Sequence, residues 1–416
     1  MKDLITEVSK DELRHIAITG AHLHTWQGNG SSGLRDIIKS RGLIQLDPLN
    51  PAGRYHDLFF LARLPDYMLG QFEQIAYAEK LVFEAYSPNL SAISIEHFPV
   101  YFSEMVKEKL HPYYKRKIDQ FEDSNPGLLE KLYQIVQDQG SIRSADLAHL
   151  GKADPSYASW KSSRVAGSGL EYLWLLGRLA VVRRNDQFHK TYDLSERYVP
   201  ERYYHKIELS DDEFKFQRFK IQQQSFSLRL LGNFSVSKGK LRFGKTKFFS
   251  AHWLDYNEEL RPHIVQLEGT RKAIAVPPYW KSLLDQKYDD EIRALGPLDP
   301  LIWDRELTKL VFNFDYTWEV YKKPNDRKWG YYVYPILYHG TLIGRLEAKF
   351  NKKTKELTFF NASFEKDLEM NNKIEKALEN LFIRWKNMLQ AEEITTDSTV
   401  MRFYTVSNEG SQGETH

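Results

Sequence analysis

Two polar side chains, Gln45 and Asp47, stand two positions apart in the apolar stretch GLIQLDPL. Side chains alternate along an extended strand, so Gln45 and Asp47 would share one face while Ile44 and Leu46 are buried on the other. A carboxylate can stabilise positive charge and accept a proton, and an amide both donates and accepts hydrogen bonds. The pair is a candidate catalytic site. On spacing alone, however, the favoured interpretation is that the two side chains cap loops or bind Arg54.

Other short motifs do not support a different chemistry. GKLRFGKT, residues 239–246, matches the phosphate-loop expression, but polar NFSVSK precedes it where a buried apolar strand is needed, so we reject nucleotide hydrolysis. The chain has no cysteine, which excludes disulfides, thiol catalysis and cysteine-ligated zinc. HLH at residues 22–24 adjoins a flexible break, and neither His-Glu-x-x-His nor Gly-x-Ser-x-Gly occurs. We expect no metal and no cofactor.

The elements that position Gln45 and Asp47 begin with two helices. Ser9 and Glu12 form a capping-box pattern ahead of an apolar helical repeat. GNGSSG then predicts a flexible break. GLRDIIKSRGLIQLD predicts a helix that closes at Gly42 and leads into the extended segment.

The clearest local pattern lies in residues 121–204. NPGLLEKLYQIVQDQG predicts a helix with Pro126 at its first position that ends at Gly140, SIRSADLAHLG a short second helix capped by Ser144, and SSRVAGSGLEYLWLLGRL a third. LAVVRRNDQFHKTYDL predicts two strands around a turn. Helix, helix, helix, hairpin is the order of a winged helix.

Basic residues of this pattern suit contact with a DNA backbone. Lys161 and Arg164 stand at the entry of the third helix, and the wing carries Arg183, Arg184, His189 and Lys190. The alternative is a winged helix that serves only as a packing scaffold.

The second half of the chain changes character. Residues 205–295 are less regular and hold the densest positive run, 238–247, which fits either phosphate contact or a solvated loop. After Gly296, LTKLVFNFDYTWEVYKK, WGYYVYPILYHGTLIGRLEAKF and KELTFFNASFE predict the strands of a small sheet or barrel. NKIEKALENLFIRWKNML predicts a helix that packs on it through Ile374, Leu378, Leu381, Trp385 and Met388. We expect the final SNEGSQGETH to be disordered.

Composition limits the class of protein. A chain of 416 residues needs more than one core, and 42% hydrophobic content supports compact folding. The 58 basic and 56 acidic residues nearly cancel, so any nucleic-acid binding must come from a local patch. No uninterrupted apolar stretch reaches membrane-spanning length, and the N-terminus lacks the apolar core of a signal peptide.

The segment GLIQLDPLN...RYHDLFFLARLPDY resembles the Gln-x-Asp segment of the AlkZ/YcaQ-type DNA glycosylases, the crosslink-repair branch of the winged-helix DNA-binding family. The likeness continues through WKSSRVAGSGLEYLWLLGRLAVVRRNDQFHKTYDLSERYVP and LDPLIWDRELTKLVFNFDYTWEVYKKPNDRKWGYYVYPILYHGTLIGRLEAKF. It therefore covers most of the chain in order.

The resemblance implies an α+β fold of tandem winged-helix units followed by a C-terminal β-barrel with a packing helix. The expected boundaries are 1–120 for the first winged-helix unit with the motif, 121–204 for the second, 205–295 for a third, winged-helix-like unit, 296–395 for the barrel and its helix, and 396–416 for the tail. The family also implies base excision repair of N-alkylated purines and, for members with Asp in the motif, unhooking of interstrand crosslinks.

The implied chemistry suits these residues. An N3- or N7-alkylated purine already carries positive charge, so it can leave without a general acid. Asp47 would stabilise the oxocarbenium-like sugar and act as general base, and Gln45 would hold the water or the sugar-phosphate. No lysine nucleophile is required, which implies a monofunctional glycosylase that forms no covalent adduct.

The resemblance extends to DNA contacts. Arg54 and His56 occupy the family's basic pair, which could touch phosphate or pair with Asp47 or Asp66. NDRKWGY matches a basic barrel hairpin, so Arg327 and Lys328 are candidates for contacting a DNA groove, with Trp329 either wedging or packing.

One stretch departs from the family pattern. Where members commonly show an aromatic-x-His-Glu-Ala-Ser stretch, this chain reads AYSPNLSAI, with Pro88 and Asn89 replacing the His and Glu. A different lesion preference or a loss of activity would follow if that His shapes the pocket.

We therefore expect a monomeric DNA glycosylase of the cytoplasm, associated with the nucleoid and not with a membrane. Its partner would be double-stranded DNA carrying alkylated or crosslinked bases. The alternative is a regulatory winged-helix DNA-binding protein without catalysis, in which Gln45 and Asp47 are structural. The large barrel region and the lack of an obvious dimerisation helix argue against that alternative.

Overall fold

The fold was analysed in a computed structural model that describes residues 6–106, 110–159, 163–237, 240–243 and 263–400. The chain divides into two compact units, each built from separate stretches of sequence. Unit 1 comprises Met1–Leu34, Leu49–Leu69 and Gln223–His416, and unit 2 comprises Arg35–Pro48 and Gly70–Gln222. The chain therefore passes from unit 2 to unit 1 directly after the segment that holds Gln45 and Asp47.

Unit 1 contains a five-stranded sheet in the order β1-β9-β10-β7-β8. Its strands are β1 (Thr6–Val8), β7 (Arg229–Ser237), β8 (Lys240–Phe243), β9 (His263–Leu267) and β10 (Lys272–Val276). The helices α11 (Trp280–Leu283) and α13 (Arg305–Phe312) contact α1 (Lys10–Gly20). The capping box of α1 is confirmed, because Ser9 Oγ accepts from the Glu12 amide and Glu12 Oε2 accepts from the Ser9 amide.

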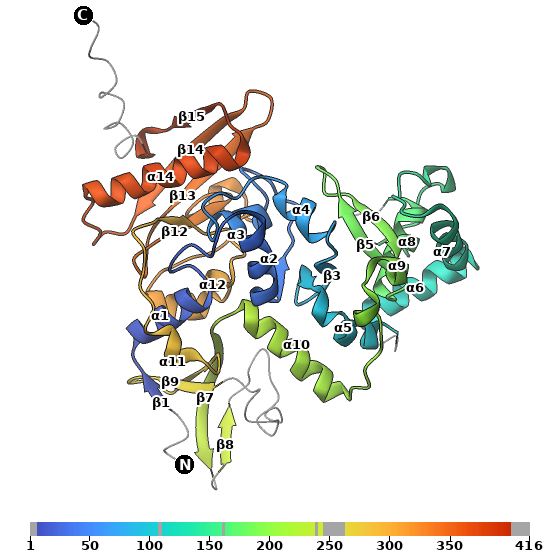
Figure 1. The fold of residues 1–416 in the computed structure, drawn as a ribbon, viewed down its shortest axis with the longest axis horizontal. Helices are drawn as coiled ribbons and strands as arrows, with labels where there is room; N and C mark the ends of the chain where they lie inside the picture. The colour runs from blue at the N-terminus through green and yellow to red at the C-terminus, as the bar shows by residue number, and fades with distance from the viewer. Residues whose placement is uncertain (1–5, 107–109, 160–162, 238–239, 244–262, 401–416) are drawn as a thin grey trace, which may run out of the picture. The chain divides into compact units, whose positions relative to one another are not determined.

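A second five-stranded sheet of unit 1 has the order β11-β12-β13-β14-β15. Its strands are β11 (Arg293–Ala294), β12 (Val333–Tyr338), β13 (Thr341–Asn351), β14 (Glu356–Phe364) and β15 (Glu393–Thr396). Helix α14 (Asn372–Leu389) lies across this sheet (Figure 1), where the Phe382 ring stacks on Phe359 with centroids 4.0 Å apart. All five apolar residues expected to pack are buried. The packing helix is thus confirmed, and within the described residues the strands run in one linear order, which gives a half-barrel and not a closed barrel.

Two expectations for unit 1 are wrong. LTKLVF forms helix α13, not a strand, because Asp304 Oδ1 accepts from the Leu307 amide at the helix start and Leu307 and Val311 are buried at helical spacing. GNGSSG is not a flexible break throughout, since α2 (Gly30–Arg41) begins inside it. The Asp66 carboxylate accepts from the Gly30 amide at 2.9 Å and satisfies that helix end.

Unit 2 contains a three-stranded antiparallel sheet in the order β2-β4-β3. Its strands are β2 (Leu43–Gln45), β3 (Val82–Tyr86) and β4 (Leu90–Ser94). The helices of this part are α4 (Gln71–Ala76), η2 (Ile95–His97) and α5 (Phe98–Met105). The chain leaves unit 2 within α10 (Asp211–Ser225).

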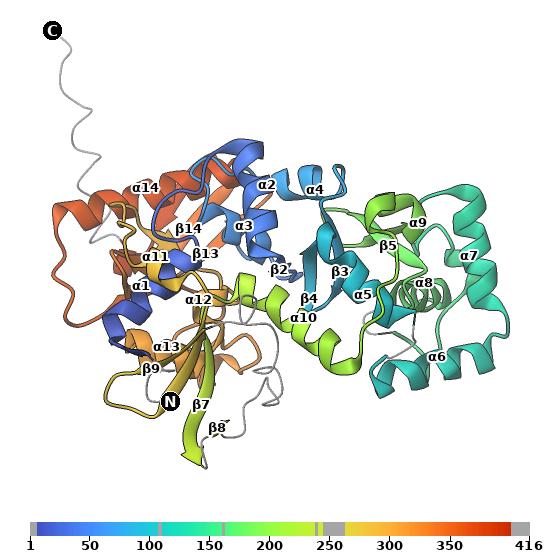
Figure 2. The ribbon, with the colours of Figure 1, turned by 60° about the horizontal axis from the view of Figure 1, so that its bottom comes forward.

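The remaining part of unit 2 follows the expected order with one change. Its elements are α6 (Pro112–Ser124), α7 (Leu128–Gln139), η3 (Ala148–Leu150), α8 (Val165–Leu175), β5 (Leu179–Arg184), β6 (Lys190–Leu194), α9 (Ser195–Tyr198) and η4 (Glu201–Tyr203). Figure 2 shows α6, α7 and α8 grouped together. Where a second helix was expected there is only a turn and η3, because the Asp146 carboxylate bonds the Arg143 amide and guanidinium. The winged-helix assignment stays a prediction.

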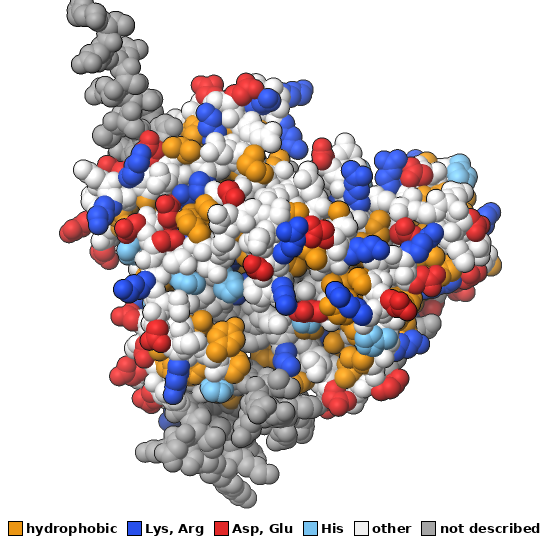
Figure 3. All heavy atoms as spheres, in the orientation of Figure 1, with side chains coloured by type: hydrophobic (Ala, Val, Ile, Leu, Met, Phe, Trp, Pro, Cys, Tyr) orange, Lys and Arg blue, Asp and Glu red, His pale blue; other side chains and the backbone are white. Residues whose placement is uncertain are grey.

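The surface carries both signs of charge. On the face drawn in Figure 3, Lys and Arg side chains are interspersed with Asp and Glu, as expected for a net charge of +2. Among the described residues, no helix combines the length and apolarity needed to cross a bilayer.

Candidate active site

Gln45 and Asp47 lie at the end of strand β2 in unit 2. Gln45 pairs with Ser91 of β4, and the Leu46 amide donates to Leu90 O at 2.8 Å. Ile44 is 2% exposed and Leu46 is 4% exposed, whereas Gln45 and Asp47 are half-buried. Burial alternates from Ile44 to Asp47 as expected, although Leu43, on the Gln45 side of β2, is also buried and Asp47 lies two residues beyond the strand.

The residues that depart from the expected pattern lie beside this strand. Pro88 and Asn89 are exposed in the turn between β3 and β4. The turn is tied down at Ser87, whose amide donates to Asn89 O at 2.7 Å and whose Oγ accepts from Tyr101 Oη at 2.6 Å. The next residue, Leu90, accepts a hydrogen bond from the Leu46 amide. Pro88 and Asn89 therefore lie beside the residues of the Gln-x-Asp motif.

The chain that follows Asp47 is fastened to the C-terminal sheet of unit 1. Pro51 O accepts from the Phe350 amide of β13 at 2.7 Å, and Ala52 O accepts from Trp385 Nε1 of α14 at 2.7 Å. Gly53 has φ +110° and lies against Met388 and Leu58. Any other residue at position 53 would adopt a strained backbone conformation, and its Cβ would lie only 3.1 Å from Met388 Cε.

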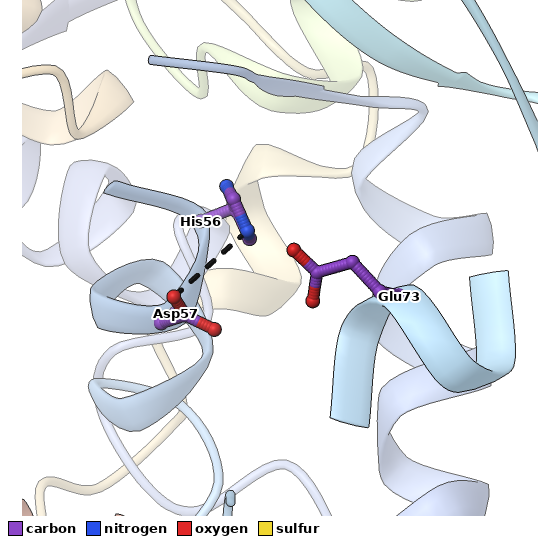
Figure 4. A group of neighbouring side chains, drawn as sticks. All are labelled: His56, Asp57 and Glu73. Carbon is purple, nitrogen blue, oxygen red and sulfur yellow. Dashed lines mark ion pairs between the residues drawn. The ribbon is translucent and has the colours of Figure 1, made fainter. Parts of the chain in front are cut away.

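The expected basic pair lies at the start of α3 (Tyr55–Leu61), with little exposure. Arg54 is 8% exposed and His56 is 1% exposed. Asp57 Oδ2 accepts from the Arg54 amide at 3.1 Å and Oδ1 accepts from Tyr67 Oη at 2.8 Å. Figure 4 shows His56 beside Asp57, with Nε2 3.9 Å from Oδ2. At the start of α3, both residues of this pair therefore interact with Asp57.

A buried ion pair was missed by sequence reasoning. Arg63, in the RLP stretch, donates through Nη1 to Asp299 Oδ2 at 2.9 Å, and both side chains are 0% exposed. Arg63 also donates to the carbonyls of Ala21 and Phe59. The only sequence signal was an arginine inside the apolar run FFLARLP.

Two buried carboxylates shape the basic loop that contains η6 (Pro324–Asp326). Glu319 accepts from the Lys328 amide at 3.1 Å and the Trp329 amide at 2.7 Å, and Glu347 accepts from the Tyr331 amide at 2.8 Å. Burial by itself would raise the pKa of Glu319, but hydrogen bonds from the Lys322 side chain and these amides outweigh it and lower the pKa to about 2.

The two expected basic residues of this loop differ in exposure, since Lys328 is exposed and Arg327 is half-buried. Lys328 is exposed, with Nζ 2.9 Å from Asp315 Oδ2, and the Arg327 guanidinium lies 4.8 Å from the Tyr331 ring centroid. Trp329 packs under Arg345, which lies 3.8 Å from its ring centroid. Trp329 therefore packs rather than projecting as a wedge.

The basic residues of the predicted winged helix that were expected to contact DNA differ sharply in exposure. Arg183 and Arg164 are exposed. Arg184 is buried and donates through Nε and Nη2 to the Glu84 carboxylate of β3 at 2.6 and 2.5 Å. This pair gives Arg184 a structural role. Lys161, together with the run 244–247, lies outside the described residues.

A pocket of about 710 Å³ opens beside the basic loop, and we call it the sheet pocket. It is lined by Asn50, Pro51, Pro324, Arg327, Lys328, Trp329, Gly330, Tyr331, Tyr332, Glu347, Ala348, Lys349, Phe350, Phe360 and Asn361. The pocket brings Arg327 and Lys328 together with the chain just after the Gln-x-Asp segment. Sequence reasoning missed Lys349, although it opens the basic run at residues 349–355.

Comparisons with known proteins agree with this architecture. A family model described as "DNA glycosylase AlkZ-like" matches residues 38–382. The solved structure of Streptomyces sahachiroi DNA glycosylase AlkZ is similar with a TM-score of 0.57 and 16% sequence identity, covering 94% of this chain and 100% of that one. At that identity the likeness concerns the fold alone, and it confirms the mixed α+β class.

Proposed function

Because this chain belongs to the AlkZ-like DNA glycosylase family, we propose that it hydrolyses the N-glycosidic bond of alkylated purines in duplex DNA. The observation that carries the proposal is the placement of Gln45 and Asp47, which are half-buried beside buried Ile44 and Leu46, at the end of β2 and just after it. A half-buried carboxylate attracts a nearby positive charge more strongly than a fully solvated one, because the effective dielectric constant around it is lower.

The proposed reaction needs no general acid. Alkylation at N3 or N7 leaves the purine positively charged, so the bonding electrons of the C1′–N bond pass to the base as it departs. Asp47 stabilises the positive charge that develops on the sugar. It then accepts a proton from the water whose oxygen bonds C1′, while the Gln45 amide orients that water. No protein–DNA bond forms, which makes the enzyme monofunctional.

The same chemistry extends to interstrand crosslinks. A crosslink through an alkylated base nitrogen presents the same cationic leaving group, and its hydrolysis on one strand separates the two strands. We propose unhooking as a second activity of the same residues.

We propose DNA contacts only for basic side chains that are accessible to solvent, and for Lys161. Arg164 and Arg183 in unit 2 and Arg327 and Lys328 in unit 1 are the surface candidates for phosphate. Lys161 remains a proposal on sequence alone. Arg54, His56 and Arg184 support the fold around them, and we propose no direct phosphate contact for these buried side chains.

A DNA-binding protein without catalysis is the second candidate. The observation that favours it is the turn at Pro88 and Asn89, which alters the residues next to the motif strand.

Base release distinguishes the two candidates. The wild-type protein is incubated with one duplex carrying N7-methylguanine and another carrying an N7-linked interstrand crosslink, and free base and abasic sites are quantified. We expect release from the first duplex and strand separation of the second, with no adduct trapped by borohydride. Binding to both duplexes without release would establish the non-catalytic function.

A further inference from the structure

The sheet pocket has walls of the kind that bind nucleotides. Its volume of about 710 Å³ falls among small-ligand sites, and its lining includes the rings of Tyr331, Phe350 and Phe360. Tyr331 is 41% exposed, and both phenylalanines are half-buried. Accessible rings of this type stack on unpaired bases of any sequence.

The charges of the pocket favour an anion. Among the described residues, neither Arg327 nor Lys349 has an ion-pair partner, whereas Lys328 is engaged by Asp315. The one carboxylate in the lining, Glu347, accepts from the amides of Tyr331 and Tyr332 and from Asn361 Nδ2, at 2.8, 2.9 and 3.0 Å. The lining therefore holds three basic side chains, Arg327, Lys328 and Lys349, against this one carboxylate. The turn after β13 adds exposed Lys352 and Lys353.

The pocket is also tied by the chain to the motif. Asn50 of the lining is three residues after Asp47. The pocket lining thus includes residues that directly follow the motif in the chain.

We propose that the sheet pocket receives one unstacked nucleotide of the substrate DNA, with its base against Tyr331 and the phenylalanine rings and its phosphates on Arg327 and Lys349. This inference rests on the proposed function, since it requires the chain to bind DNA. It adds a ligand subsite that is separate from the Gln-x-Asp chemistry.

The test uses undamaged DNA, so it does not depend on excision. Two duplexes of one sequence are compared, one fully paired and one with a single bulged 2-aminopurine, and the full-length protein is titrated by fluorescence anisotropy. We expect the wild type to bind the bulged duplex about tenfold more tightly, which is about 1.4 kcal/mol. The protein should also quench 2-aminopurine emission as the base stacks.

The variants locate the effect in the pocket. Tyr331→Ala combined with Lys349→Ala should abolish the preference and the quenching while thermal unfolding stays unchanged. The control Tyr279→Ala removes a ring that is 59% exposed outside the pocket, and it should behave as wild type. Equal binding of both duplexes by the wild type would overturn the inference. If the double variant still prefers the bulged duplex, the preference arises from easier bending of that DNA, and the inference is again overturned.

The two proposals fail in different ways. A wild type that releases damaged base but ignores the bulge leaves the proposed function intact and removes the subsite. A bulge preference lost in the double variant, without base release from any lesion, keeps the subsite and removes the glycosylase.

Discussion

Buried charges around the Gln-x-Asp segment serve the fold. Asp57 fixes the start of α3 through the Arg54 amide, and Arg63 joins two parts of the chain that are 236 residues apart. An arginine at 0% exposure is stable only while its carboxylate partner and its carbonyl acceptors are present. These residues hold in place the chain that follows Asp47.

Arg63→Ala should lower the free energy of unfolding by about 3–5 kcal/mol, because it leaves the Asp299 carboxylate buried and unpaired. Urea denaturation measures the change. As a control, Arg143→Ala removes a surface ion pair with Asp146 at 2.7 Å and should cost under about 1 kcal/mol. Equal losses from the two variants would contradict a structural role for the Arg63–Asp299 pair.

Sequence spacing predicted the alternation at Gln45 and Asp47, because a strand period of two depends only on neighbours. It could not predict which basic residues are buried. Arg184 meets Glu84 across 100 positions, and such a partner is invisible to a local pattern. Arg183, next to it, points to solvent by the same alternation.

At the scale of elements, the hairpin β5–β6 offers a matched pair of adjacent arginines. Arg183→Ala should leave stability unchanged, weaken DNA binding and reduce the salt dependence by about one unit of slope. Arg184→Ala should instead lower the free energy of unfolding by about 3–5 kcal/mol, because Glu84 loses its partner. Thermal unfolding and anisotropy titrations at several salt concentrations separate the two effects. A stability loss in Arg183→Ala alone would reverse the assignment.

The basic loop after Glu319 should be sensitive to acid. The folded-state pKa of Glu319 is lowered from its ordinary 4.5 to about 2, so its stabilisation is present above about pH 4.5 and is lost as the pH falls toward 2. The contribution is on the order of 1–2 kcal/mol after allowance for solvent screening. Thermal unfolding from neutral to acid pH should show this loss in the wild type. An identical pH profile in Glu319→Gln would contradict it.

Elements with strong local signals were predictable. The capping box of α1, the strands β12 to β14 and the helix α14 follow from caps, turns and apolar periods. LTKLVF was misassigned because its β-branched residues suggest a strand, whereas the cap from Asp304 and burial of one helical face decide the outcome.

At the scale of the whole molecule, each of the two compact units is built from separate stretches of sequence, and the expected domain boundaries stay a prediction. Residues 49–69 complete unit 1 through contacts with β13 and α14. The sequence predicted that this stretch belongs to an N-terminal unit, because no local pattern indicates its contacts with β13 and α14, which follow about 300 residues later in the chain.

A fragment of residues 296–416 should therefore fail to fold as a unit. It lacks the Ala52 carbonyl that accepts from Trp385 Nε1, the Pro51 carbonyl that accepts from Phe350, and Tyr55, which packs against Gly296. The exposed apolar face should remove cooperative thermal unfolding, which the full-length chain should retain. A cooperative transition in the fragment, with native-like circular dichroism, would show that the C-terminal sheet is independent.

The most direct test of the central claim compares wild type and Asp47→Asn on the N7-methylguanine duplex. Asn keeps the size of Asp47 but removes the charge and the proton acceptor. We predict that base release falls at least about 10²-fold while the duplex Kd changes less than about twofold. Release by Asp47→Asn at the wild-type rate would contradict the assignment of Asp47 as the carboxylate that drives excision.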